Sequence, residues 1–275
     1  MTESEQQLRT GWEPDAPASD SLTRAFLLNS AESFASPVRA MDGCVLATDQ
    51  MIATDLGRPA TFLNSIIPFQ PLSPQNLEEV VAQVDDFYGF GAADSGLTGE
   101  VMLWSAWPTP DLRGHGWQLG GHPPLHLLPA GATAPPAPAE LEIREVATRA
   151  DLETFEETAI IGFPFTNFLP YRPGNLFDER VLPDKRMRRW IGSVAGRAVS
   201  ISACFLAAGI NTIALVGTVP EARGKGYGAA LTWRAALAEP GLPAMLLSSD
   251  MGRPVYDRMG FLPLYRFTVW YRGRP

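Results

Sequence analysis

The sequence is poor in cysteine and has no long apolar run. Its two cysteines, Cys44 and Cys204, lie far apart, each in an apolar segment, which argues against a disulfide scaffold or a thiol metal site and predicts buried structural thiols. No stretch approaches the roughly 20 apolar residues that span a bilayer. The first 20 residues are polar and acidic, unlike a signal peptide. We therefore expect a cytoplasmic protein without a membrane partner.

Basic residues are scarce in the first half of the chain. Residues 1–140 carry 5 Lys and Arg against 17 Asp and Glu, whereas residues 141–275 carry 17 against 13. The net charge of the whole chain is −8, and an acidic chain is a poor candidate for general nucleic-acid binding. We expect no nucleic-acid partner. The mildly basic second half suits a small polyanionic ligand such as a coenzyme.

Histidine is also scarce, with His115, His122 and His126 as its only occurrences. Pro123 and Pro124 break any helical register between them. Ligands for a metal need a defined spacing on one element or a shared site. The sequence therefore predicts no metal site.

A segment of alanine and proline divides the chain. Residues 130–139 read AGATAPPAPA, a composition that supports neither helix nor strand and is typical of a semi-extended linker. Around it, the 45% hydrophobic content is ample for packed cores. We expect a flexible tail over residues 1–20, a first domain over 21–129, the linker over 130–139 and a second domain over 140–275.

Hydrophobic periodicity predicts α/β structure with mixed sheets in both halves. In the first half we expect helices over 22–34 and from Ser73 onward, and strands over 44–51, 61–67, 101–107 and 125–128. In the second half the expected order is β-α-β-β-β-α-β-α-β. It places a helix from Thr148, a hairpin turned at Gly196, strands over 212–219 and 244–249, a short helix over 253–258 and a last strand over 264–271. Both halves run strands, then strand, helix, strand, which suggests a degenerate internal duplication.

The feature with the clearest chemical meaning is a glycine-rich loop between a buried strand and a helix. It reads Arg223-Gly224-Lys225-Gly226-Tyr227-Gly228. Backbone without side chains lets N–H groups converge on an anion, and a helix N-terminus adds its dipole. Phosphate oxygens are the usual ligands of such a loop, and Arg223 and Lys225 add positive charge at its rim.

Two phosphate-binding schemes fit this loop poorly. A P-loop needs Gly-x-x-x-x-Gly-Lys followed by Ser or Thr, and here Gly226 follows Lys225. A dinucleotide fingerprint is closer, because Gly224-x-Gly226-x-x-Ala229 matches it and Asp250 closes the next strand. However, a turn over residues 220–223 intervenes, and only 25 residues follow Asp250, too few for a doubly wound sheet.

A third scheme covers more of the sequence. Residues 216–231 resemble the coenzyme-A signature of the GNAT superfamily of acyl-CoA N-acyltransferases: a hydrophobic strand, a proline-containing turn, then Arg/Gln-x-x-Gly-x-Gly/Ala opening a helix. A second block, residues 251–261, resembles the family's short helix with Tyr256, three residues, and Gly260-Phe261. The resemblance covers residues 140–275 and implies an acyl-CoA N-acyltransferase fold, in two tandem copies of which the first is degenerate.

The resemblance implies a set of site residues and a mechanism. Acetyl-CoA is the acyl donor, and an amine attacks its thioester directly. Tyr256 protonates the departing sulfur, since an ordinary tyrosine with a pKa near ~10 is protonated at neutral pH. The residues expected at the coenzyme are Gly217, Thr218 and Val219 along the pantetheine arm, and Arg223, Gly224, Lys225, Gly226, Tyr227, Gly228 and Ala229 at the pyrophosphate.

The sequence departs from the family pattern at the base. Many members carry a glutamate in the strand before the loop, whereas residues 211–215 read NTIAL. Glu157, Asp250 or a water relay remain open as the base. The acceptor, a small-molecule or peptide amine, also stays open, as do the preferred acyl group and a homodimer. Phe163, Phe165, Phe168 and Tyr171 lie where the family builds acceptor loops. The same residues suit core packing equally well. A coenzyme-binding sensor or scaffold without turnover is the alternative function.

The first half lacks a comparable loop. Between its expected strand and helix lies Pro68-Phe69-Gln70-Pro71-Leu72, which contains no glycine. Proline also removes the N–H donors that an anion site requires. We therefore expect this half to be a structural or acceptor-shaping partner that does not bind coenzyme A.

Overall fold

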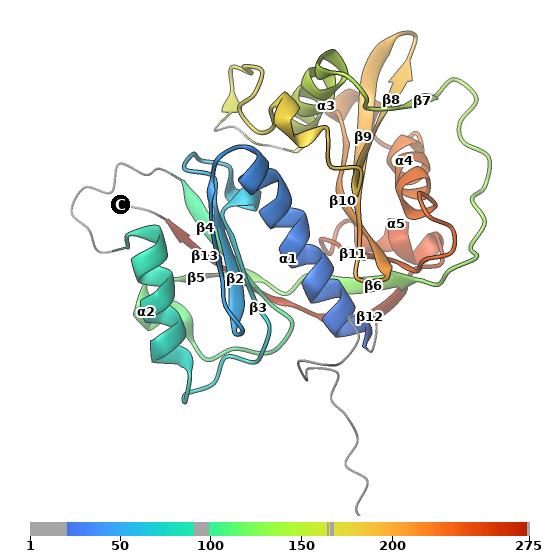
Figure 1. The fold of residues 1–275 in the computed structure, drawn as a ribbon. Helices are drawn as coiled ribbons and strands as arrows, with labels where there is room; N and C mark the ends of the chain where they lie inside the picture. Colours follow the sequence, from blue (N-terminus) through green and yellow to red (C-terminus); the bar gives the residue numbers. More distant parts are fainter. Residues whose placement is uncertain (1–20, 91–98, 164, 166–167, 274–275) are drawn as a thin grey trace, which may run out of the picture.

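The computed structural model describes residues 21–90, 99–163, 165 and 168–273, and shows two mixed sheets with helices packed on them (Figure 1). The predicted tail over residues 1–20 lies outside the described residues. The elements of the first half are α1 (Leu22–Ala40), β1 (Cys44–Ala47), β2 (Met51–Asp55), the 3-10 helix η1 (Thr61–Leu63), β3 (Ser65–Pro68), α2 (Leu77–Tyr88), β4 (Glu100–Ser105), the 3-10 helix η2 (Leu112–His115), β5 (Gln118–Gly121) and β6 (Pro124–Leu128).

The second half follows the predicted order of strands and helices up to its last strand, in whose place the structure has two. Its elements are β7 (Glu142–Glu145), α3 (Arg149–Gly162), the 3-10 helix η4 (Glu179–Val181), β8 (Met187–Val194), β9 (Arg197–Ala207), β10 (Ile210–Thr218), the 3-10 helix η5 (Pro220–Ala222), α4 (Tyr227–Ala236), β11 (Ala244–Leu247), α5 (Arg253–Arg258), β12 (Leu262–Arg266) and β13 (Thr268–Gly273).

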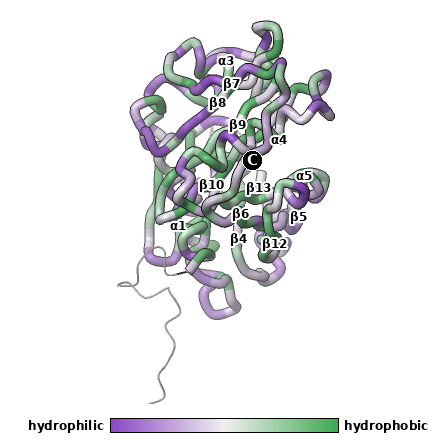
Figure 2. Tube along the Cα trace, turned by 90° about the vertical axis from the view of Figure 1, so that its right-hand side faces the viewer, coloured by the Kyte–Doolittle hydropathy of each residue, from purple (hydrophilic) through white to green (hydrophobic). Residues whose placement is uncertain are grey.

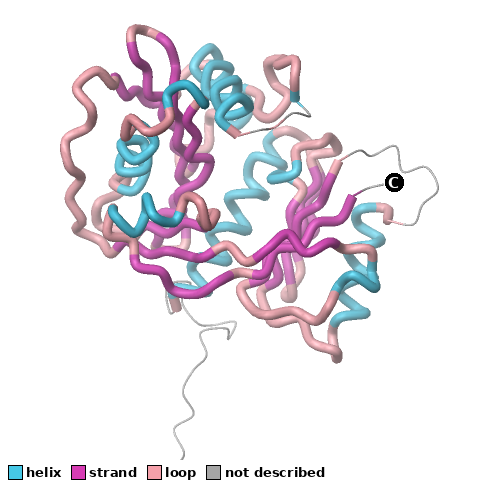
Figure 3. The backbone as a smooth tube through the Cα atoms, turned by 180° about the vertical axis from the view of Figure 1, so that it is seen from behind, coloured by secondary structure: helices cyan, strands magenta, loops and turns pink. Residues whose placement is uncertain are grey.

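The two sheets have a similar strand arrangement, and each contains one strand from the other half of the chain. The strand order is β1-β2-β3-β4-β13-β5 in one sheet and β7-β8-β9-β10-β11-β6-β12 in the other. Each sheet contains one parallel pair, β3 with β4 and β10 with β11. Beside each pair lies a strand from the other half, β13 in the first sheet and β6 in the second, and Figure 3 shows strands crossing between the two bodies. This reciprocal plan confirms a duplicated, tandem arrangement.

Helix α1 connects the two sheets from the side. It packs against β2 and β3 of the first sheet and β9 and β10 of the second (Figure 1). On the second sheet, α3 covers the same face as α1, while α4 and α5 pack with the opposite face. Figure 2 shows hydrophobic residues along the interior strands and hydrophilic ones on the outer loops. Strands β10 and β11 therefore have α1 and α3 on one face and α4 and α5 on the other.

Local sequence signals explain several element boundaries. Helix α3 begins with a capping box, in which the Thr148 hydroxyl accepts from the Asp151 N–H and the Asp151 carboxylate accepts from the Thr148 N–H. The β8–β9 hairpin turns at Ala195 and Gly196, with φ of 48° and 77°, as the right-handed twist of a two-residue hairpin favours. Both features agree with the sequence predictions.

Other predicted boundaries were wrong. Helix α1 continues to Ala40 instead of ending at residue 34, and Ser73 forms a turn before α2, which begins at Leu77. The strand predicted over 44–51 is a hairpin, since Thr48 turns the chain between β1 and β2. The last predicted strand divides into β12 and β13, which belong to different sheets.

The two cysteines differ in environment. Cys204 lies on β9 in the core, and burial raises the pKa of its thiol to about 12. Cys44 is exposed, so the prediction that it is buried was wrong. It begins β1, which is the edge strand of its sheet. Within the described residues, no helix is long and apolar enough to cross a membrane.

Candidate active site

Strands β10 and β11 separate along their length and leave a gap in the second sheet. They pair in parallel only at Asn211 with Ala244 and at Thr212 with Met245. Asn211 also fixes the far side of this pair, because its side-chain amide donates to the carbonyls of Ala235 (2.7 Å) and Ala236 at the end of α4. The predicted splaying of the strands on either side of the glycine loop is present.

A β-bulge lies in β10 where the gap opens. The pairing of β10 with β9 shifts register between Ala214 and Gly217, and Leu215 has a φ of 50°. A bulge places an extra residue on one strand and takes its backbone groups out of the ladder. Leu215 and Val216 lie within this irregularity, between the two paired stretches of β10 and β9.

The three residues predicted along the pantetheine arm lie at the end of β10. They differ in whether their backbone groups already have hydrogen-bond partners. The Val219 N–H donates to Val199 O (3.0 Å), and its carbonyl accepts from Ala222 N (3.0 Å), so both groups are already engaged. Along an antiparallel strand, hydrogen-bonded groups alternate in direction, so the Thr218 N–H faces away from β9, toward the gap. The Thr218 carbonyl accepts from Arg223 Nε (3.1 Å).

The glycine loop has the backbone geometry of an anion site. Gly224 and Gly226 have φ values of 77° and 84°, in the left-handed region that glycine adopts without strain. Gly226 is the N-cap of α4 and offers no side chain to the first turn. The N–H groups of Tyr227, Gly228 and Ala229 therefore lack helical acceptors and point out of the helix end.

Two side chains of the loop, those of Arg223 and Tyr227, have structural rather than phosphate-binding positions. Arg223 donates through Nη2 to Gly162 O (2.9 Å), tying the loop to the end of α3. The Tyr227 ring is buried, and its hydroxyl donates to Glu140 Oε1 (2.8 Å), a hydrogen bond that raises the pKa of Tyr227. Lys225 is exposed and has no ion-pair partner in the described part of the chain, so it alone places a free cation at the rim.

Tyr256 lies on α5, directly after β11 and the gap. Its half-buried ring is between His126 and Phe261, with ring centroids 6.0 and 5.8 Å away. Burial raises the pKa of Tyr256 to about 12. Its hydroxyl has no hydrogen-bond partner among the described residues and remains a donor to a ligand.

The carboxylates considered as bases are poorly placed for that role. Asp250 accepts a hydrogen bond from Arg266 Nη2 (2.8 Å), which lowers the pKa of Asp250 and makes it a weaker base. Glu157 is exposed on α3. Its neighbour Glu156 is fully buried, and its carboxylate accepts four hydrogen bonds, from the N–H groups of Gly174, Leu176 and Phe177 and from the Tyr171 hydroxyl.

Glu156 is a residue that the sequence reasoning missed. Its position four residues after Leu152, on the face that also carries Phe155 and Ala159, was a signal for burial. The structure uses it to hold the segment over 171–177 against α3. Tyr171, predicted near the acceptor, belongs to this network.

An aromatic cluster covers the face of β10 that bears α3. Phe163 and Phe165 stack at 5.4 Å, and Phe165 contacts Phe168 at 6.2 Å. Phe62, from η1 in the first half, packs edge-on to Phe165 at 5.3 Å. Phe163 lies close over Gly217, where an added Cβ would come within 3.0 Å of the ring. The first half thus contributes to the surroundings of the gap.

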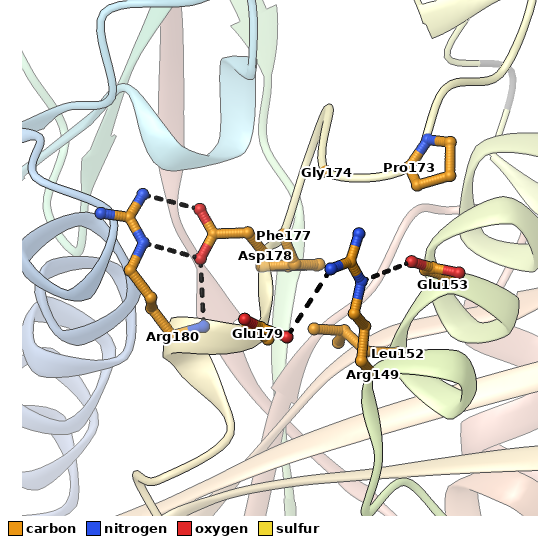
Figure 4. A pocket seen from close by; sticks show the side chains of 9 residues that line it. All are labelled: Arg149, Leu152, Glu153, Pro173, Gly174, Phe177, Asp178, Glu179 and Arg180. Atoms are coloured by element: carbon orange, nitrogen blue, oxygen red, sulfur yellow. Dashed lines mark hydrogen bonds and ion pairs between the residues drawn. The ribbon is translucent and has the colours of Figure 1, made fainter.

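A cavity of about 250 Å³ lies elsewhere, at the first turn of α3 (Figure 4). Ion pairs flank it, Arg149 with Glu153 (2.9 Å) and Arg180 with Asp178 (2.7 Å). Helix α3 has 14 residues and spans about 20 Å at 1.5 Å per residue. Because Arg223 reaches the opposite end of α3, this cavity is separate from the glycine loop.

The histidines do not converge on a metal site. His115 is 3.7 Å from Glu78, whereas His126 is buried beside Ser248. Among the residues that the structure describes, no group of three or more His, Cys, Asp or Glu is placed to hold a metal ion.

Comparison with solved structures gives the fold a name. A GCN5-related N-acetyltransferase from Kribbella flavida matches 90% of this chain and 95% of its own, with a TM-score of 0.62 and 19% identity. The chain has the fold of the GCN5-related N-acetyltransferases. A GCN5-related N-acetyltransferase from Sphaerobacter thermophilus matches over 95% and 93% (TM-score 0.53, 17% identity), and a GNAT-family protein from Novosphingobium aromaticivorans over 87% and 97% (TM-score 0.53, 16% identity).

The likeness extends over both halves, so the tandem prediction is confirmed at the level of fold. No protein-family model matches the sequence, and no curated protein matches it. The division into residues 21–129 and 140–275 stays a prediction, since each sheet contains a strand from the other half.

Proposed function

We propose that the protein is an N-acetyltransferase that moves an acetyl group from acetyl-CoA to an amine. The observation that carries this proposal is the continuity of the gap between β10 and β11 with the left-handed glycine loop at the N-terminus of α4. A pantetheine arm needs such a slot between strands, and a pyrophosphate needs convergent N–H groups at its end. The GCN5-related fold supports the same assignment.

Binding is assigned to backbone groups more than to side chains. The N–H groups of Gly224 to Ala229 receive the pyrophosphate, with Lys225 as the rim cation. Donors at Thr218 and in the bulge at Leu215 serve the arm and the thioester carbonyl. Arg223 acts indirectly, since its guanidinium holds the loop to Thr218 O and Gly162 O. A donor aimed at a carbonyl oxygen stabilises the charge that develops there during attack.

Chemistry is assigned to direct attack with Tyr256 as the acid. The amine nitrogen forms a bond to the acetyl carbon, the C–S bonding pair moves onto sulfur, and the Tyr256 proton neutralises the thiolate. The amine reaches the gap from the face covered by α3 and the Phe62–Phe163–Phe165 cluster, which favours a partly apolar acceptor. A water molecule relays its proton, because Asp250 is held by Arg266.

A panel assay tests this function. Thiol release from acetyl-CoA is measured with alkylamines, arylalkylamines and amino-terminal peptides, beside calorimetric binding of acetyl-CoA. We expect micromolar binding and release with at least one amine class. Binding without release by any amine favours the alternative, a coenzyme-binding sensor, and absence of binding contradicts both.

A further inference from the structure

The linker between the two halves packs along α4 and contacts both ends of that helix. Just beyond the C-terminal end of α4, the Gly131 N–H donates to Pro240 O (3.2 Å), and Ala132 packs against the hydrophobic core that contains α4. At the other end, the Tyr227 hydroxyl donates to Glu140 Oε1 (2.8 Å), directly after the linker. Figure 1 shows this segment passing outside α4 on its way from β6 to β7. The linker therefore contacts the helix that carries the glycine loop.

A proline of the linker also reaches the glycine loop itself. Pro138 Cγ lies 3.7 Å from the position that a Cβ on Gly226 would occupy. The Pro138 carbonyl accepts from the Leu141 N–H (3.0 Å), in a turn that contains Glu140. Because Leu141 is buried in the core that it shares with α4, this turn is held in place beside the loop.

Tyr227 connects the turn to the anion site. It is the first residue of α4, after the N-cap Gly226, and the first hydrogen bond of the helix runs from the Ala230 N–H to Gly226 O (3.0 Å). The N–H groups of residues 227–229 therefore have no acceptor within the helix. Tyr227 is only 4% exposed, and its hydroxyl reaches Glu140. One side chain thus fixes the orientation of the first free N–H groups of α4.

A glycine-rich loop needs such support from outside. Glycine has more backbone freedom than other residues, so ordering Gly224, Gly226 and Gly228 around an anion costs conformational entropy. Gly226 also has no side chain with which to cap α4. The loop is held before the glycines by Arg223, which is bonded to the end of α3, and after the N-cap by Tyr227. A site that is ordered before its ligand arrives binds that ligand more tightly.

We propose that Glu140 is a positioning residue for the coenzyme. Its carboxylate holds Tyr227, and with it the N–H groups that receive the pyrophosphate, in the binding orientation before acetyl-CoA arrives. The proposal deepens the proposed function and rests on it. It makes the end of the linker a part of the coenzyme site, in which Glu140 acts through Tyr227 instead of touching the coenzyme.

The charge of Glu140 separates this role from a direct electrostatic one. Its own backbone N–H, the Tyr227 hydroxyl and the Lys225 cation lower the pKa of Glu140, so it is a carboxylate at neutral pH. The same hydrogen bond raises the pKa of Tyr227, which keeps the hydroxyl protonated as the donor. A negative charge near a phosphate site weakens binding, whereas a positioning contact strengthens it. The two effects therefore have opposite signs.

The test is calorimetric binding of coenzyme A to the full-length protein and to two variants of equal charge. Glu140→Gln keeps an oxygen that accepts from Tyr227, whereas Glu140→Leu has none, and both remove the negative charge. We expect Glu140→Gln to bind at least as tightly as wild type. Glu140→Leu should bind about 3- to 10-fold more weakly than Glu140→Gln, as for the loss of one hydrogen bond. Equal affinities of the two variants overturn the proposal.

The Tyr227 hydroxyl gives an independent test. Tyr227→Phe keeps the buried ring, removes the donor and should weaken coenzyme binding about 3- to 10-fold; unchanged affinity overturns the proposal. Tyr265→Phe is the matched control, because the Tyr265 hydroxyl also joins two elements, β12 and α1, through Thr23 Oγ1 (3.0 Å). When each is combined with Tyr227→Phe, Glu140→Gln and Glu140→Leu should have equal affinities, since no donor remains. A persisting difference contradicts a coupled pair.

Kinetics separate positioning from general damage to the fold. In the proposed enzyme, Tyr227→Phe should raise KM for acetyl-CoA and leave kcat and KM for the amine near wild type, because Tyr227 is not at the reacting atoms. A fall in kcat together with Tm contradicts the positioning role. A wild type that binds coenzyme A without turnover sinks the proposed reaction, yet the binding series still decides the role of Glu140. Absence of binding to wild type contradicts both.

Discussion

Replacing Glu156 with glutamine should destabilise the protein far more than the same change at Glu157. The Glu156 carboxylate accepts two hydrogen bonds at each oxygen, from Leu176 and Phe177 at Oε1 and from Gly174 and Tyr171 at Oε2. A glutamine amide offers one acceptor oxygen and one NH₂ group, so at least one pair of donors loses its acceptor.

The loss of unfolding free energy can be estimated from the donors that are left without an acceptor. With the amide nitrogen in place of Oε2, the Tyr171 hydroxyl can still donate to Glu153 O (3.0 Å), but the Gly174 N–H is left facing a donor. One unsatisfied buried N–H costs about 1–3 kcal/mol, and the other bonds lose their charge assistance, so we expect a total near 3 kcal/mol. For a chain of this size that corresponds to a fall in Tm of about 6–12 °C.

The assay is thermal unfolding of Glu156→Gln beside Glu157→Gln. Both variants remove one negative charge from adjacent positions of α3, but Glu157 is exposed and its variant should stay within about 0.5 kcal/mol of wild type. In the proposed enzyme, Glu156→Gln should also raise KM for the amine and leave coenzyme affinity unchanged, because the loop that it holds packs beside Phe168. Equal Tm values for the two variants would refute the network.

Three further outcomes are expected. Tyr256→Phe should lower turnover at least tenfold with coenzyme affinity nearly intact, and wild-type turnover in the variant would remove Tyr256 from the mechanism. In the wild type, the Tyr256 pKa of about 12 predicts that ionisation of this residue causes no loss of activity below about pH 11. Phe62→Ala should change the ranking of amines in the panel assay while the binding of acetyl-CoA stays constant, and an unaltered ranking would exclude the first half from acceptor selection. A thiol reagent should modify Cys44 alone in the native protein and Cys204 only after unfolding, so rapid native labelling of both would contradict the burial of Cys204.

The parts of the site that local sequence could predict are those built from consecutive residues. The glycine loop can adopt positive φ at Gly224 and Gly226 because those positions lack side chains, and an apolar, unbroken segment from Tyr227 onward favours the helix that follows. Tyr256 follows from its spacing to Gly260 and Phe261. These inferences need no knowledge of distant contacts.

The parts that escaped prediction depend on pairing between distant segments. The last strand divides at Phe267, whose N–H donates to Pro123 O, so β12 stays in one sheet while β13 enters the other. Periodicity reports which residues are buried but not which sheet buries them. For the same reason His126 reads as an isolated histidine in sequence, although the inserted strand places it beside Ser248.

The hydrogen-bond partners of the side chains at the glycine loop also could not be predicted from residue spacing. Arg223 was expected as a rim charge, yet its guanidinium contacts Gly162 O, a residue 61 positions earlier. Tyr227 was expected at the coenzyme, yet its hydroxyl contacts Glu140. In both cases the side chain holds the loop to another part of the protein, and the expected contact with the coenzyme stays a prediction.

The most direct test of the account is calorimetric binding of acetyl-CoA to wild type, Gly226→Glu and Gly57→Glu. Gly226 and Gly57 both have positive φ, 84° and 72°, so the two variants carry the same backbone strain and the same added charge, but Gly57 lies in the first half. We predict wild-type affinity in Gly57→Glu and at least a 100-fold loss in Gly226→Glu, where a carboxylate meets the pyrophosphate site. Equal affinity in all three proteins would contradict the assignment of the coenzyme to the glycine loop.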